Sequence, residues 1–420
     1  MKLLVVGSGG REHAVIRKLK ENKEIEKIYC APGNGGISAD AECVDIKATD
    51  KENMVKFAKE NAIDFCVVTP DDPLALGMVD EMEEAGIPCF GPKANAAIIE
   101  ASKAFSKDLM KKYGIPTADY ETFDNEKEAL HYMEEKNTFP IVIKADGLAL
   151  GKGVLICETL DDAKTALREM MVEHVFGLSG NKVVVEEFMT GKEVSVLAFT
   201  DGNVVKPMIS SMDHKRAYDN DEGLNTGGMG TIAPSPYYTK EIAETCMETI
   251  FLPTVKAMNA EGRTFKGCLY FGLMLTPKGP RVVEYNCRFG DPETQVVLPL
   301  LNSDLLTIMK ACHDGTLKDV DVVWSEEACA CVVEASGGYP VKYEKGFEIH
   351  GLDENGQHDG VIVYHAGTKK ENGKFYTNGG RVLGITAKGA TLQDALDKAY
   401  EAVKEIGFDK MHYRTDIGKK

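Results

Sequence analysis

The chain has 420 residues, 43% hydrophobic and 27% charged, which is the composition of a globular protein long enough for several folded domains. Its 49 Lys and Arg residues and 66 Asp and Glu residues give a net charge of −17, which argues against a protein that coats nucleic acid or anionic membranes. The 11 cysteines form no C-x-x-C pair and no apolar run approaches membrane-spanning length, so we expect a cytoplasmic protein with reduced thiols.

The N-terminal segment predicts alternating strands and helices. Strands are expected at residues 3–7, 27–31, 65–69 and 88–90, and helices at 11–20, 50–61 and 72–85. Apolar strands that alternate with helices are typical of a doubly wound parallel sheet. After the first strand, the amides of Gly9 and Gly10 at a helix start can hold a phosphate, with Arg11 beside them. A turn that needs glycine only for its geometry is the alternative. Glu12 replaces the third glycine of a dinucleotide fingerprint, so NAD binding is not expected.

The next segment brings lysines towards a glycine-rich loop. Residues 95–113 predict a long helix that carries Lys107, and residues 140–145 predict an apolar strand that contains Lys144. A buried strand rarely holds an unpaired lysine, so Lys144 is predicted to be functional. The loop that follows, 147–153, can lay backbone amides over phosphates, although it is not a Walker A loop. A strand is then predicted at residues 182–188.

A second polar loop follows a strand predicted at residues 202–212. Residues 213–230 are rich in charge and glycine, and long irregular loops in compact domains are usually functional. Asp213 could recognise an ammonium, and the basic residues 214–216 could neutralise a phosphate.

A helix at 240–259 and a β-hairpin with strands at 267–275 and 281–285 lead to the stretch that concentrates the predicted chemistry. Side chains alternate along a strand, so Glu284, Asn286 and Arg288 are expected on one face.

These residue types suit a metal-held polyphosphate. Carboxylate and amide oxygens are ligands for a hard cation such as Mg²⁺, and arginine binds phosphate or carboxylate bidentately. Asp291 and Pro292 predict an N-cap and the first residue of a helix. Taken alone, the stretch is equally compatible with a surface salt bridge beside a helix cap.

The C-terminal segment predicts short strands joined by glycine-bearing loops. Strands are expected at residues 329–335, 347–352, 361–365 and 382–387, followed by a helix at 392–406. Arg381 is a candidate anion contact, with a solvated arginine as the alternative.

Several of these stretches resemble one family. RFGDPETQ at residues 288–295 resembles the diagnostic block of the phosphoribosylamine–glycine ligase family, which belongs to the ATP-grasp superfamily. Further similar blocks run in order along the chain: GSGGREH at 7–13 with Ser8 as the one change, ASKAFSKDLM at 101–110, DHKR at 213–216, NTGGMG at 225–230 and YRTDIG at 413–418. TPDDPL at 69–74 departs from the G-P-E-x-P-L expected there.

The resemblance implies an α/β fold with three domains. These are an N-terminal doubly wound parallel sheet at 1–101, a central ATP-grasp domain at 102–325 with a lid subdomain at about 121–190, and a small α+β domain at 326–420.

The resemblance also implies ATP-dependent ligation of glycine to 5-phosphoribosylamine through glycyl phosphate, in purine (IMP) biosynthesis. The implied cofactors are ATP and Mg²⁺ or Mn²⁺, and the implied partners are small molecules, with no nucleic acid, no membrane and a monomeric chain. Implied ATP contacts are Lys107, Lys144, Gly147, Gly151, Lys152, Glu186, Glu187, Phe188 and Glu193. Implied substrate contacts are Gly9, Gly10, Arg11, Glu12, Asn225, Thr226, Gly227, Gly228, Gly290 and Asp291. Glu284 and Asn286 would bind the metal, and Arg288 and Asp213 would act in catalysis.

Other classes of function stay open. A nicotinamide dehydrogenase would explain the N-terminal strands and helices, but it leaves the 284–295 stretch without a purpose. A non-enzymatic nucleotide-binding regulator and an ATP-grasp ligase for another phosphoribosyl intermediate are the remaining alternatives.

Overall fold

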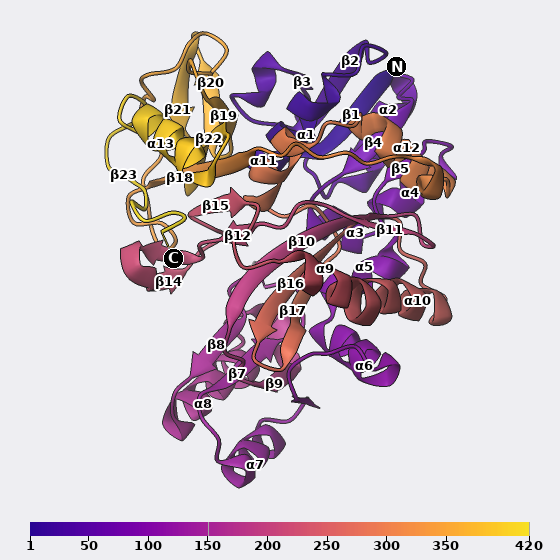
Figure 1. Cartoon of the computed structure of the whole chain (residues 1–420), viewed down its shortest axis with the longest axis vertical. Coiled ribbons are helices and arrows are strands. Elements are labelled where there is room, and N and C mark those ends of the chain that lie inside the picture. Colours follow the sequence, from indigo (N-terminus) through magenta and orange to yellow (C-terminus); the bar gives the residue numbers. More distant parts are fainter. Residues whose placement is uncertain (150, 420) are drawn as a thin grey trace.

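A computed structural model of the chain describes residues 1–149 and 151–419 and begins with the predicted parallel sheet (Figure 1). The strand order is β3-β2-β1-β4-β5, with all neighbours parallel. The strands are β1 (Lys2–Gly7), β2 (Lys27–Pro32), β3 (Glu42–Cys43), β4 (Phe65–Val68) and β5 (Cys89–Phe90). The connecting helices include α1 (Gly10–Leu19), α2 (Lys51–Glu60), α3 (Asp71–Ala75) and α4 (Met78–Glu84). Along β1, Leu3 and Val5 join one hydrophobic cluster while Leu4 and Val6 join another, so helices cover both faces.

Two helices predicted as continuous are interrupted. The segment 72–85 breaks at Gly77, whose φ of +90° is left-handed, so α3 ends and α4 begins there. The segment 95–113 breaks at Ser102, which has extended backbone and accepts a hydrogen bond from the amide of Phe105 as an N-cap. The resulting helices are α5 (Ala94–Ala101) and α6 (Lys103–Tyr113).

Two four-stranded antiparallel sheets form the centre of the chain. One has the order β6-β9-β7-β8, with strands β6 (Tyr120–Phe123), β7 (Ile141–Ala145), β8 (Val154–Cys157) and β9 (Val183–Glu187) and helices α7 (Glu126–Lys136) and α8 (Leu160–Leu167). The other has the order β11-β10-β16-β17, with strands β10 (Lys192–Thr200), β11 (Val205–Pro207), β16 (Gly267–Thr276) and β17 (Gly279–Asn286). The first sheet has its own hydrophobic core and projects away from the rest of the molecule (Figure 1).

The strand predicted at residues 202–212 is wrong, while the β16–β17 hairpin is confirmed. The long strand here is β10, and residues 202–212 contain a turn and the short strands β11 and β12 (Met212–Asp213). Asp201 caps the turn by accepting hydrogen bonds from the amides of Asn203 and Val204. Both faces of β10 are buried, with Val196 in one cluster and Phe199 in another, so it lacks the alternation that marks a half-exposed strand.

The C-terminal sheet has the order β12-β15-β18-β22-β19, so two strands from the middle of the chain complete it. Its remaining strands are β15 (Gly230–Ala233), β18 (Ala328–Ser336), β19 (Ile362–His365) and β22 (Arg381–Gly389), with β23 (Met411–His412) paired to β18. Helix α13 (Leu392–Val403) packs on this sheet (Figure 1). The strand predicted at 347–352 is wrong, because only isolated bridges occur there, and the hairpin β20 (Thr368–Glu371) and β21 (Lys374–Thr377) was not predicted.

The remaining helices connect these sheets. The predicted helix 240–259 is confirmed as α9 (Lys240–Cys246) and α10 (Leu252–Ala260), joined by a π-helical turn at Met247–Phe251. Helices α11 (Glu293–Val297) and α12 (Leu305–Asp314) follow β17. Across residues 1–149 and 151–419, no helix combines the length and the apolar character needed to cross a membrane.

Candidate active site

A cleft of about 820 Å³ is lined from both central sheets and from the loop after β12. The predicted site residues that line it are Arg11, Lys107, Lys144, Gly151, Glu186, Glu187, Phe188, Glu193, Asp213, Asn225, Thr226, Gly227, Glu284, Asn286, Arg288 and Asp291. The predicted residues outside its lining are Gly9, Gly10, Glu12, Gly147, Lys152, Gly228 and Gly290. Leu150, in the predicted 147–153 loop, lies outside the described residues.

A buried glutamate holds the two lysines that were predicted to contact ATP. Glu186 at the end of β9 lies 3.0 Å from the Lys144 ammonium and 3.5 Å from the Lys107 ammonium. Lys107 also donates to Thr117 Oγ1 at 2.7 Å and to Ala118 O at 3.1 Å. Burial lowers the pKa of Lys107 to about 8, although Glu186 opposes this shift. Lys107 is thus fixed by its neighbours.

Lys144 is less fully engaged than Lys107. Its other hydrogen bond, among residues 1–149 and 151–419, goes to Val283 O at 3.2 Å. An ammonium has three N–H donors, so Lys144 keeps one for a ligand in the cleft.

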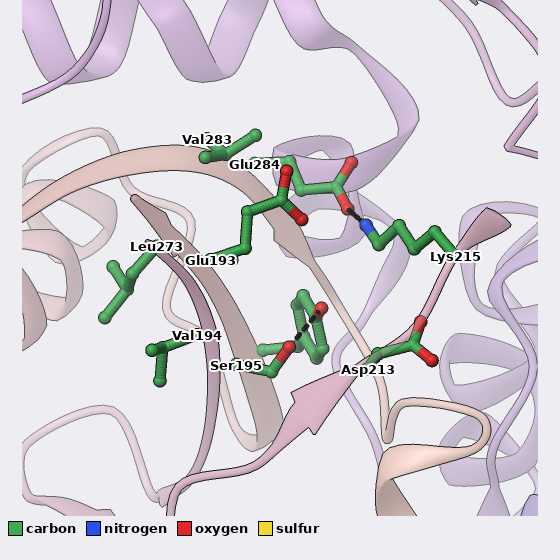
Figure 2. Close-up of a pocket in the computed structure, with 10 residues that line it drawn as sticks. Glu193, Val194, Ser195, Asp213, Lys215, Leu273, Val283 and Glu284 are labelled. Carbon is green, nitrogen blue, oxygen red and sulfur yellow. Dashed lines mark hydrogen bonds and ion pairs between the residues drawn. The ribbon is translucent and has the colours of Figure 1, made fainter. Parts of the chain in front are cut away.

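The end of the cleft at β17 carries hard-oxygen groups. The carboxylate of Glu284 lies 3.6 Å from the ammonium of Lys215, and Figure 2 shows that ammonium directed at it, with the carboxylate of Glu193 nearby. Burial raises the pKa of Glu284, but Lys215 and the other surrounding cations outweigh this and hold it below its ordinary value. Glu284 is therefore ionised at neutral pH.

Asn286 presents an oxygen to the same cleft. Its amide nitrogen donates to Glu100 Oε1 at 3.1 Å and to Tyr285 O at 2.9 Å, which leaves its carbonyl oxygen as the group for a ligand. Within the described residues, no group of three or more His, Cys, Asp or Glu side chains could hold a metal. A carboxylate and an amide oxygen fit Mg²⁺, which is usually bound by one or two protein oxygens together with water and phosphate.

Arg288 follows the strand and lines the cleft with Glu284 and Asn286, although Val283 and Tyr285, which alternation places on the other face, line it as well. Its guanidinium pairs with Glu100 at 3.1 Å and donates to Phe289 O at 3.2 Å. The predicted N-cap role of Asp291 is wrong, because α11 begins at Glu293 and the capping position is Pro292. Asp291 instead accepts hydrogen bonds from the Arg11 amide and from Gln295 Nε2.

The loop after β12 is braced by the C-terminal domain. Arg381 donates to Gly227 O at 2.9 Å and to Asp291 O at 3.0 Å, so it joins this loop to the stretch after β17. The fully buried Arg414 donates to Arg216 O and pairs with Asp221 and Asp416. The loop is thereby held in a defined shape.

Asp213 lies near both negatively and positively charged side chains. Burial and, next, the nearby Glu293 raise the pKa of Asp213 well above its ordinary value, while Lys215 and Arg381 oppose the shift. A cationic ligand beside Asp213 would favour its ionised form.

The glycine turn after β1 is closed by Glu12. Its carboxylate accepts hydrogen bonds from the Gly9 amide at 2.7 Å and from Arg11 Nε at 2.8 Å. Thr69 Oγ1 lies 2.7 Å from the same carboxylate, so the threonine that departs from the family pattern contacts the turn directly. In this structure the Gly9 amide faces Glu12.

Glu100 was missed from the sequence, as were the cleft-lining residues Lys103 and Tyr270. One signal could have found Glu100, because it is the only charged residue of α5, whose sequence is ANAAIIEA. Tyr270 lies on the buried strand β16 and looks like core from its sequence context.

Comparisons with known proteins agree over the whole chain. Family models described as Phosphoribosylglycinamide synthetase match with the N domain at residues 1–100, the ATP-grasp (A) domain at 101–294 and the C domain at 329–420. The Phosphoribosylamine--glycine ligase of Caldanaerobacter subterraneus subsp. tengcongensis is 50% identical over 417 residues, 99% of each chain. That of Clostridium acetobutylicum is 48% identical over 419 residues, 100% of each chain.

Solved structures are similar to this chain over nearly its whole length. The crystal structure of Phosphoribosylamine--glycine ligase from Thermotoga maritima is 33% identical, covers 100% of both chains and has a TM-score of 0.88. The biotin carboxylase domain of the Hydrogenobacter thermophilus 2-oxoglutarate carboxylase, at 18% identity and a TM-score of 0.74 over 98% of this chain and 91% of that one, shares the fold. The family models, the full-length relatives and the solved structure at 33% identity thus agree, and the chain belongs to the phosphoribosylamine–glycine ligase family.

Proposed function

We propose that this chain ligates glycine to 5-phosphoribosylamine, with ATP as the energy source, to give glycinamide ribonucleotide, ADP and phosphate in purine biosynthesis. The observation that carries the proposal is that Lys144, Glu284 and Arg288 line one cleft in a chain of this family.

The chemistry requires activation of a carboxylate, which is a poor electrophile. An oxygen of the glycine carboxylate attacks the γ-phosphorus of ATP, and ADP leaves, giving glycyl phosphate. The amine of phosphoribosylamine then attacks the acyl carbon, the C–O bond to phosphate breaks, and the amine loses a proton. Phosphoryl transfer depends on alignment and charge stabilisation, which is what fixed lysines and hard-oxygen ligands supply.

The nucleotide is assigned to the part of the cleft between the two central sheets. Lys144 is assigned to the phosphates and Lys107 to the phosphates or the adenine side, and the 147–153 loop, with Gly147, Gly151 and Lys152, is assigned to cover the phosphates. Glu186 holds both lysines in place. Glu187 and the exposed ring of Phe188 border the adenine, and Glu193 accepts from the ribose hydroxyls.

Glu284 and Asn286 would hold Mg²⁺ or Mn²⁺, and the bound ion would neutralise the phosphate charge during transfer. Lys215, 3.6 Å from Glu284, keeps that carboxylate ionised and directed into the cleft.

The substrates are assigned to the β17 end of the cleft. Arg288 keeps guanidinium donors for the glycine carboxylate or its acyl phosphate, and Asp213 accepts a hydrogen bond from the glycine amino group. The phosphoribosyl group is assigned to the 225–228 loop and to residues 9–12, with Gly290 and Asp291 between them. The Arg381 guanidinium donates to the carbonyl oxygen of Asp291, and the backbone amide of Arg11 donates to its carboxylate, so both arginines are held at this corner, where their side chains would bind the anionic group.

The chain is also proposed to act as a monomer. Its 11 free cysteines, of which only Cys43 is exposed, support a reducing compartment such as the cytoplasm. Sedimentation at assay concentrations would test the oligomeric state.

The proposed function is tested by measuring phosphate release from ATP with each substrate omitted in turn. We expect turnover only when glycine and phosphoribosylamine are both present. Turnover with another phosphoribosyl acceptor and no glycine would identify a different ligase, and nucleotide binding without any turnover would indicate a regulator.

A further inference from the structure

Glu100 is a buried carboxylate at the point where β17 ends, although it comes from α5, more than 180 residues earlier in the chain. Its Oε1 accepts a hydrogen bond from Asn286 Nδ2 at 3.1 Å and pairs with Arg288 Nη2 at 3.1 Å. Its Oε2 accepts from the backbone amide of Cys287 at 2.8 Å. One side chain with an exposed fraction of 8% therefore contacts three consecutive residues, of which Asn286 and Arg288 line the cleft.

These contacts determine which way the amide of Asn286 faces. The nitrogen Nδ2 lies near a carboxylate oxygen and near Tyr285 O, and both of these groups only accept hydrogen bonds. The reverse orientation would place the carbonyl oxygen against two acceptors. The Asn286 oxygen is thus directed away from Glu100, as a metal ligand requires.

We propose that Glu100 is a positioning residue that sets the metal-binding orientation of Asn286 and holds Arg288 beside it. The inference rests on the proposed function, because it takes Asn286 to be a metal ligand. Partners of this kind fix the orientation of metal ligands, and their loss typically costs about 10- to 100-fold in metal affinity or activity.

The isosteric variant Glu100→Gln removes this control. A glutamine has one oxygen and one NH₂ group, whereas its surroundings present donors to both positions. If the glutamine oxygen faces Asn286 and Arg288, its NH₂ group faces the N–H of the Cys287 amide. If the side-chain amide is turned over, its NH₂ group faces Asn286 Nδ2 instead. In either orientation, Glu100→Gln therefore leaves two hydrogen-bond donors facing each other on one side of the glutamine amide.

The experiment measures ADP binding by calorimetry over a Mg²⁺ titration, without glycine or phosphoribosylamine. For Glu100→Gln we expect the Mg²⁺ concentration at half-maximal binding to rise by about tenfold or more, with unchanged affinity for metal-free ADP. Asp201→Asn is the matched control, because Asp201 is also a buried carboxylate that accepts backbone amides, but it does not line the cleft. This control should lose thermal stability and keep the Mg²⁺ dependence of the native protein.

A reciprocal variant distinguishes positioning from structural support. In Glu100→Gln/Asn286→Asp the net charge is conserved, the glutamine NH₂ group can donate to the new carboxylate, and that carboxylate keeps an oxygen for the metal. We expect this double variant to need less Mg²⁺ than Glu100→Gln. If Glu100→Gln does not fold, the double variant is compared with the single variant Asn286→Asp, in which the new carboxylate faces the carboxylate of Glu100, and we expect the double variant to need less Mg²⁺ than this one as well.

Two results would overturn the inference. One is a Glu100→Gln protein that melts at a lower temperature but has an unchanged Mg²⁺ requirement. The other is a double variant that needs at least as much Mg²⁺ as the single variants. Failure of the ligase proposal is distinguishable, because it would appear in the substrate-omission assay of the native protein and not in these binding curves.

Discussion

Protonation of His365 is predicted to destabilise the junction between the N-terminal and C-terminal sheets in mild acid. His365 is fully buried, its Nε2 lies 2.7 Å from Gly356 O, and its backbone amide donates to Nδ1 of the buried His13 at 2.9 Å. Burial and, next, His13 lower the pKa of His365 from 6.5 to about 3.

The direction of the effect follows from linkage. The pKa of His365 is lower in the folded state than in the unfolded state. Its contribution to the free energy of unfolding is therefore present above pH 6.5 and is lost as the pH falls from 6.5 towards 3. With these pKa values, the loss between pH 7 and pH 5 is about 2 kcal/mol. The pKa of His13 is also lowered by burial, and its protonation acts in the same direction.

The native protein alone would not isolate this contribution. Glu334 is buried without a hydrogen-bond partner in the described structure, and burial raises its pKa well above the ordinary value, so acid acts on it in the opposite direction. Comparison of the native protein with His365→Asn cancels the titrating groups that both proteins share.

The assay is urea unfolding at several pH values, followed by the fluorescence of Trp324, the one tryptophan of the chain. The stability difference between the native protein and His365→Asn should fall by about 2 kcal/mol from pH 7 to pH 5 and stay constant above pH 8. The same difference at pH 5 and pH 7 would refute the reasoning.

Four further predictions concern the active site. Glu284→Gln should abolish turnover and preserve the fold, because a neutral amide cannot balance the metal charge; near-normal turnover at moderate Mg²⁺ would exclude the metal role. Arg288→Lys should lose a charge-assisted hydrogen bond that costs about 1.5–3 kcal/mol, which is about ten- to a hundredfold in turnover. A lower melting temperature with full glycine-dependent activity would limit Arg288 to its pair with Glu100. The 147–153 loop should be a mobile lid whose hydrogen exchange slows when an ATP analogue binds, and unchanged exchange would count against this. Arg414→Lys should raise the KM for phosphoribosylamine and speed hydrogen exchange in residues 214–228, because an ammonium cannot keep the contacts to Arg216 O, Asp221 and Asp416 together. Unaltered kinetics would show that the contacts of Arg414 do not affect substrate binding.

Sequence patterns predicted the helices and strands whose buried positions follow a clear apolar pattern. The N-terminal parallel sheet and the β16–β17 hairpin were predicted because apolar runs and turn residues mark them clearly. The strand β10 was missed because it is buried on both faces, and the break at Ser102 was missed because the apolar pattern continues through it. The family was predicted from contiguous motifs, and the comparisons confirm it.

Tertiary contacts explain the parts of the site that the sequence did not reveal. Glu100 contacts Asn286 and Arg288 only because α5 packs beside the end of β17. The role of Arg381 in joining Gly227 to Asp291 likewise depends on the C-terminal sheet reaching the central loop. Such contacts join segments far apart in the chain, and no local spacing encodes them.

The central claim, that glycine is activated as glycyl phosphate, is tested most directly with glycine labelled with ¹⁸O in both carboxylate oxygens. The reaction is run to completion with ATP and phosphoribosylamine, and the isotope content of the released phosphate is measured by mass spectrometry. Transfer of the γ-phosphoryl group to the carboxylate predicts one ¹⁸O atom in each phosphate, because the C–O bond breaks when the amine attacks. Phosphate released without ¹⁸O would contradict the acyl-phosphate route.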